Sequence, residues 1–146
     1  MIRPTSENIF RRLSFIEGEW KGELSNRDTG RFLDELKCTM ENNRLVGVSS
    51  LQVDGEQVGT RRFEIWVEGN LVLGVWEVDG ERTGVYVCEY EDEKDEFLFN
   101  LRDNPTSIDY RTIRRIDLMH FITMEQLPRE GTSSVETLQM EYQRTL

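Results

Sequence analysis

Histidine, cysteine and proline are scarce in this chain of 146 residues, which has one histidine, two cysteines and three prolines. A single histidine cannot supply a multi-histidine zinc or iron site. The cysteines, Cys38 and Cys88, lie in separate alternating segments without metal-ligand spacing. We interpret them as small apolar side chains, which predicts no metal site and fits a reducing cytoplasm.

Positive charge and long apolar runs are also in short supply. The 18 basic residues are outnumbered by 28 acidic ones, for a formal net charge of -10. This balance disfavours phosphate backbones and anionic membrane surfaces, so neither nucleic acid nor a membrane is an expected partner. No run approaches the roughly 20 apolar residues that span a bilayer, and the N-terminus lacks a signal-peptide pattern. We expect a soluble cytoplasmic protein with a single domain over residues 1–146.

The apolar residues that are present follow two periods. Near the N-terminus, after Thr5 or Ser6 as the cap, they recur at helical spacing: Ile9, Phe10, Leu13 and Ile16. From Gly18 onward the period is two, and turn signals recur about every 10 to 13 residues, with Asp54-Gly55 and Asp79-Gly80 the clearest hairpins. Closure removes exposed strand edges, so the sequence predicts an all-β antiparallel meander barrel of about ten strands with a short N-terminal helix, large enough to hold a cavity.

The alternation predicts which side chains face the interior. Phasing the three strands after residue 60 places one set inside: Phe63, Ile65, Val67, Leu71, Leu73, Val75, Val85 and Val87. The opposite face would then expose an aromatic patch that includes Trp66, Trp76 and Tyr86. Because contiguous exposed apolar surface is uncommon in monomers, we predict a homodimer through this patch. The alternatives are a covering helix or loop, or a slip of the phase at a bulge.

The segment Gly18-Glu19-Trp20, the meander and the closing Tyr142-Gln143-Arg144 together resemble the calycin superfamily, the lipocalin-like barrels. The likeness is to small bacterial lipocalin-like domains of unknown function and, more distantly, to nitrobindin-like haem proteins. It implies that Trp20 lies on the first strand and that Arg144 packs across its indole ring. A guanidinium can stack on an indole while bonding backbone carbonyls, so we expect this pair to have a structural role at the closure of the barrel.

His120 is the only histidine and the one candidate for haem ligation or for a general base. Nitrobindin-like proteins hold haem through a histidine in their last strands, close to the C-terminus, whereas the final strand here has none. We therefore expect no cofactor. The orientation of the side chain stays open, because His120 points outward if Phe121 faces the interior and lines the hollow if Ile122 does.

Three further positions, on two segments, carry polar groups that could serve a ligand. Tyr110 and Arg114 share one face of a strand, and an inward arginine beside a tyrosine would suit an anionic ligand group; the alternative is a cross-strand ion pair. Asp34 shares a face with Phe32, Leu36 and other apolar residues. It could be a buried acid-base group, although a polar position at a strand end or bulge would give the same pattern.

These observations leave three functions open. The first is binding of a small apolar or amphipathic ligand, anionic ones included, against Tyr110, Arg114, Phe63, Ile65, Leu73, Val87 and Phe99. The second is a cofactor-independent isomerase, cyclase or hydrolase in the same cavity, with His120 or Asp34 as catalytic candidates. The third is an interaction protein with a filled barrel.

Overall fold

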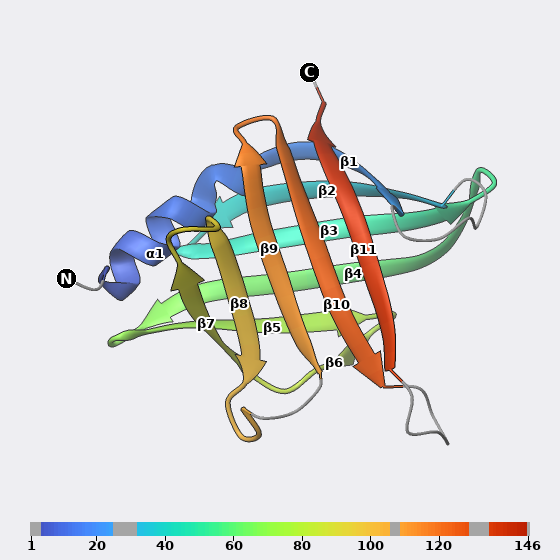
Figure 1. Cartoon of the computed structure of the whole chain (residues 1–146). Helices are drawn as coiled ribbons and strands as arrows, with labels where there is room; N and C mark the ends of the chain where they lie inside the picture. Colours follow the sequence, from blue (N-terminus) through green and yellow to red (C-terminus); the bar gives the residue numbers. More distant parts are fainter. Residues whose placement is uncertain (1–3, 25–31, 106–108, 129–134, 146) are drawn as a thin grey trace.

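The computed structural model describes residues 4–24, 32–105, 109–128 and 135–145. Antiparallel strands form a closed ten-stranded barrel with one short helix at the N-terminus, as the alternation predicts (Figure 1). The elements are α1 (Ser6–Leu13), the 3-10 turn η1 (Ser14–Ile16), β1 (Gly18–Leu24), β2 (Phe32–Glu41), β3 (Arg44–Val53), β4 (Glu56–Glu68), β5 (Leu71–Val78), β6 (Glu81–Arg82), β7 (Tyr86–Glu91), β8 (Glu96–Leu101), β9 (Tyr110–Asp117), β10 (His120–Pro128) and β11 (Val135–Arg144).

Most strands pair with their neighbours in sequence, and one pairing, between the first and last strands, joins the two ends of the meander. The last strand, β11, pairs with the first, β1, and β4 pairs with β5. The short β6 extends the edge of β5, and β7 also pairs with β5. Within the described part of the chain, no helix has the length and apolar character needed to cross a membrane.

Helix α1 lies across one end of the barrel (Figure 1). The Thr5 side chain caps the helix by accepting a hydrogen bond from the Asn8 amide at 3.2 Å, as expected for a threonine at this position. Ser6 Oγ donates to the Gly69 carbonyl in the turn between β4 and β5. Leu13 and Ile16 are fully buried against the barrel core, so this end of the interior is closed by apolar side chains.

The two hairpins predicted at Asp-Gly pairs are present. Asp54-Gly55 joins β3 to β4 and Asp79-Gly80 joins β5 to β6, each as a two-residue turn. All four residues have positive φ, between 49° and 86°. Both turns therefore require the left-handed region, which glycine adopts without a Cβ clash and aspartate tolerates.

The predicted interior face is correct for β4 but wrong for β5 and β7. Glu68 pairs with Leu71 across a two-residue turn, so Val67 lies opposite Val72 rather than Leu71. An even-numbered turn moves the inward set of β5 by one residue relative to the predicted phase. The inward side chains of these two strands are those that the predicted phase assigns to the outside: Val72, Trp76, Tyr86, Cys88 and Tyr90.

This shift removes most of the predicted outward aromatic patch. Trp76 and Tyr86 lie in the interior, 7% and 0% exposed. Trp66 does lie on the outer face, where the Arg44 guanidinium stacks on its ring at 4.5 Å. The homodimer stays a prediction, and neither Trp76 nor Tyr86 is available as its contact.

Trp20 and Arg144 form the closure pair that the resemblance to lipocalin-like barrels implies. They are register partners on β1 and β11, and the guanidinium lies 4.2 Å from the centre of the indole ring. The indole N–H donates to the Ile16 carbonyl at 2.8 Å. Arg144 donates to three backbone carbonyls, at 3.1 Å, 2.6 Å and 2.7 Å, on Leu118, Glu17 and Phe15. The Arg144 side chain on β11 thus contacts both the turn before β10 and the segment before β1.

Candidate functional site

Five polar side chains meet inside the otherwise apolar barrel, and we call them the interior polar cluster. Each comes from a different strand: Asp34 (β2), Arg61 (β4), Arg111 (β9), Glu125 (β10) and Tyr142 (β11). Asp34 and Arg111 are 0% and 4% exposed. Buried charges are costly unless they are paired, so the geometry of these contacts decides what the cluster can do.

Asp34 and Tyr142 form one end of the interior polar cluster. The Tyr142 hydroxyl donates to Asp34 Oδ2 at 2.5 Å. Gly22 of β1 lies between these two residues in the register, opposite Asp34 on one side and Tyr142 on the other. A Cβ on Gly22 would lie 2.5 Å from the tyrosine ring. The glycine therefore provides the space through which the ring crosses β1 to reach the carboxylate.

Arg61 connects this end of the cluster to the other. Its Nη2 lies 3.6 Å from Asp34 Oδ2, and its Nη1 donates to Glu125 Oε1 at 2.8 Å. Glu125 and Arg111 are register partners on neighbouring strands, with Arg111 Nη1 3.0 Å from Glu125 Oε1. The Arg111 guanidinium also lies 5.1 Å from the centre of the Trp76 ring. The contacts run without a break from Tyr142 to Arg111.

Burial and these neighbours shift the ionisation of the cluster. Burial alone would raise the pKa of Glu125, but the charges of Arg61 and Arg111 outweigh it and hold that pKa below its ordinary value. Burial lowers the pKa of Arg61, and the negative groups around the guanidinium more than reverse this, so the net shift is upward. Burial, and then the charge of Asp34, raise the pKa of Tyr142 well above its usual value. At neutral pH the tyrosine is therefore a hydrogen-bond donor.

Two members of the cluster have buried atoms without a hydrogen-bond partner. Among the described residues, Asp34 Oδ1 accepts no hydrogen bond, and neither Nε nor Nη1 of Arg111 donates one with acceptable geometry. A cavity of about 50 Å³ adjoins all five members of the cluster. Its remaining wall is mostly apolar and aromatic: Ile16, Leu36, Ser49, Phe63, Trp76, Thr112, Ile113, Phe121 and Thr123. An unpaired donor, Arg111 Nε, and an unpaired acceptor, Asp34 Oδ1, thus belong to residues that line one small space.

A larger depression of about 520 Å³ lies over β1, β2, β3 and β4. It is bordered by outward charges of both signs, including Glu19, Lys21, Glu35 and Lys37. None of its lining residues has a buried polar atom without a partner in the described part of the chain. The interior cavity is therefore the better candidate for a specific site.

Tyr110 and Arg114, the polar anchors predicted from the sequence, do not point into the interior. Phe99 and Phe97 are inward on β8, and they pair with Arg111 and Ile113. The inward set of β9 is thus the face opposite to the predicted one, and Arg114 is exposed. The inward arginine on this strand is Arg111 rather than Arg114.

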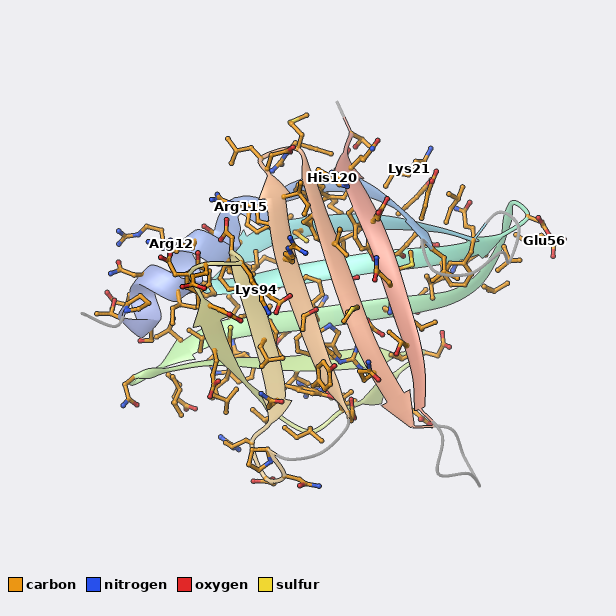
Figure 2. All side chains as sticks on the ribbon, viewed as in Figure 1. Arg12, Lys21, Glu56, Lys94, Arg115 and His120 are labelled. Atoms are coloured by element: carbon orange, nitrogen blue, oxygen red, sulfur yellow. The ribbon has the colours of Figure 1, made fainter. Side chains whose placement is uncertain are left out.

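Asp34 is inward, in agreement with one of the two interpretations of its segment. His120 is outward, because it pairs with the exposed Gln143, whereas the next residue, Phe121, pairs with the buried Tyr142 and is itself 1% exposed. Figure 2 shows His120 at the β9–β10 turn, at the start of β10. His120 therefore lies outside the cavity, and Asp34 is the remaining catalytic candidate of the two.

The predicted apolar ligand contacts divide between the two faces. Phe63 lines the cavity, and Ile65 and Phe99 are fully buried in the core beside it. Leu73 and Val87 are register partners on the outer face of β5 and β7. Leu73 is 1% exposed although it is not part of the interior core.

Sequence reasoning missed Arg61, Arg111, Glu125 and Tyr142 as members of one site. A signal was present for two of them. Glu125 continues the inward alternation of Phe121 and Thr123, and Arg111 shares a face with Ile113. A charged residue on a face that is otherwise apolar, found on several strands, indicates a buried ion-pair cluster.

The described residues include no group of three or more His, Cys, Asp or Glu side chains that could hold a metal ion. Comparison with protein-family models and with curated proteins finds no family and no protein that matches this chain.

Proposed function

We propose that the barrel binds a small amphipathic molecule in the interior cavity, with the polar group of the guest against the interior polar cluster. The supporting observation is the cavity itself, which adjoins Asp34 and Arg111, whose buried Oδ1 and Nε atoms have no partner among the described residues. A buried polar atom without a partner costs about 1–3 kcal/mol. A guest that supplies these hydrogen bonds recovers part of that cost when it binds.

The rest of the wall suits an apolar or aromatic body. Phe63, Trp76 and Phe121 contribute rings to the lining. A volume of about 50 Å³ corresponds to about three to five water molecules, since each needs roughly 10–15 Å³ on this measure. The cavity as it stands holds a guest of a few non-hydrogen atoms, and a longer guest requires side chains to move.

A pair of neighbouring serines on β3 provides the test. Ser49 is inward, 5% exposed and part of the cavity wall, whereas Ser50 faces outward. Ser49→Leu should fill the cavity and Ser50→Leu should leave it unchanged. We would titrate each variant with soluble fragments of about four to eight non-hydrogen atoms and follow backbone amides by NMR.

We expect fragments that shift the amides of cavity residues in the wild type and in Ser50→Leu, and no such shifts in Ser49→Leu. Circular dichroism and thermal melting would verify that both variants fold, because an added side chain in a packed interior costs typically about 1–3 kcal/mol. Equal binding by a folded Ser49→Leu variant would contradict the proposal.

A second function, acid-base catalysis on the guest, is supported by the hydrogen bond between Tyr142 and Asp34. The two groups are 2.5 Å apart in the cavity wall, so a proton donor and an acceptor lie together where a guest would lie. The discriminating result would be turnover of a bound compound that disappears in Asp34→Asn while binding persists. Unchanged turnover in that variant would exclude Asp34 as the catalytic group.

A further inference from the structure

The charges of the interior polar cluster balance without a ligand. Two guanidinium groups, Arg61 and Arg111, accompany two carboxylates, Asp34 and Glu125. Asp34 accepts a hydrogen bond from Tyr142 and lies 3.6 Å from the Arg61 guanidinium, so the carboxylate has a donor and a countercharge beside it. A guest with a net charge would leave one uncompensated charge in this buried space, which is expensive.

The unpaired atoms indicate which hydrogen bonds the guest should make. Asp34 Oδ1 requires a donor, whereas Arg111 Nε requires an acceptor, since Arg111 Nη1 already faces Glu125 Oε1 at 3.0 Å. Arg61 and Glu125 link these two residues, so the two requirements arise at opposite ends of one cluster. Both ends adjoin the same cavity. A guest that carries both a donor and an acceptor, with no net charge, offers the two kinds of hydrogen bond that these ends lack.

We propose that the polar group of the guest is an uncharged amide-type group, whose N–H is donated to Asp34 and whose carbonyl oxygen accepts from Arg111. This inference rests on the proposed function and narrows it, since the sequence alone leaves anionic ligands open. Anions are disfavoured because Glu125 already occupies both cluster arginines, with contacts of 2.8 Å and 3.0 Å. A second carboxylate would compete with Glu125 for the same guanidinium groups.

Three probes of equal size and different charge test this directly. Acetamide is neutral and carries a donor and an acceptor, acetate is an anion that only accepts, and acetamidinium is a cation that only donates. Each has few enough atoms for the cavity. We would titrate the wild-type protein with each probe at constant ionic strength and neutral pH, and follow the amides of cavity residues by NMR. Dissociation constants of the order of millimolar are expected for probes of this size.

We expect acetamide to bind the wild type at least tenfold more tightly than acetate or acetamidinium. If either charged probe binds as tightly as acetamide, the inference about charge is wrong, although the barrel still binds small molecules. If none of the three probes shifts the cavity amides, the proposed function and the inference both fail.

Asp34→Asn gives a second, independent readout. The substitution keeps the shape of the side chain and leaves the cluster with one excess positive charge. Acetate should then become the preferred probe. The matched control is Asp103→Asn, which makes the same charge change at an exposed turn residue and should keep the acetamide preference. Retention of the wild-type order by a folded Asp34→Asn variant would overturn the inference.

Discussion

Replacement of Arg144 by methionine should be among the most damaging single changes near the protein surface. Methionine keeps an apolar stem over Trp20 but loses the three hydrogen bonds to backbone carbonyls. At about 1 kcal/mol for each hydrogen bond, allowing for partial exposure, and about 0.5–1 kcal/mol for the cation–π contact, we expect a loss of about 3–4 kcal/mol.

Arg44→Met is the matched control for this prediction. Arg44 also stacks on a tryptophan, Trp66, at 4.5 Å, and pairs with Glu64 at 3.1 Å, and both of these contacts are with side chains. Both members of that ion pair are partly exposed, so the loss should be about 1 kcal/mol.

Urea unfolding followed by circular dichroism would give both free energies of unfolding, since backbone signal is independent of the altered tryptophan environments. A difference of about 2 kcal/mol or more between the two variants would support the assigned role of the carbonyl contacts. If Arg144→Met destabilises the protein no more than Arg44→Met, the closure pair does not depend on these hydrogen bonds and our reasoning is wrong.

Four further predictions concern buried side chains. Trp20→Ala should lower the free energy of unfolding by about 3–5 kcal/mol through lost burial and a new cavity, and a smaller effect in chemical denaturation would contradict its structural role. Glu125→Gln should lower the free energy of unfolding by about 3–5 kcal/mol because two buried guanidinium groups lose their carboxylate. The native pKa of Glu125 is depressed, so the stabilisation by its carboxylate is present above the ordinary carboxyl pKa and is lost as the pH falls through the native value. The variant should therefore lose less of its stability in acid than the wild type. Burial raises the pKa of the Cys38 thiol from 9.0 to about 12, so the thiol should resist a disulfide reagent at pH 8 in the native state, and its contribution to stability should decline as the pH rises between these values. Trp76→Glu should prevent folding and Trp66→Glu should not, as circular dichroism would show, and size-exclusion chromatography of the second variant against wild type would test the expected homodimer.

The sequence patterns are sufficient to predict the barrel and its two Asp-Gly turns, and the resemblance to lipocalin-like barrels implies the closure pair of Trp20 and Arg144. These features depend on short-range patterns and on the requirement that the last strand of a closed meander lies beside the first. The phase of β5 is not predictable from hydrophobicity, because both of its faces are apolar. Which face of β5 is inward depends on whether Gly69-Asn70 forms an even-numbered turn, because a turn that is one residue longer or shorter exchanges the inner and outer faces of the strand.

Most of the candidate site is beyond the reach of sequence patterns for a different reason. Arg61 and Glu125 are 64 residues apart and come from β4 and β10, which are not neighbours in the sheet. Their contact across the interior depends on the curvature of the closed barrel, which no local pattern encodes. Asp34 can be recognised from the sequence as a polar residue on an apolar face. Its contact with Tyr142 cannot, because the tyrosine ring reaches the carboxylate only through the space that Gly22 leaves on β1.

The interior polar cluster also discriminates between alternative ways of assembling the same strands. If β4 shifted by one residue against its neighbours, Arg61 would turn toward solvent, and Glu125 would remain buried with a single cation. Apolar residues of the opposite face could supply equivalent hydrophobic packing after such a shift, as the two-sided character of β5 illustrates. The paired charges could not be replaced in this way. Misregistered barrels of this sequence are thus penalised by unpaired buried charge even where their apolar packing would be acceptable.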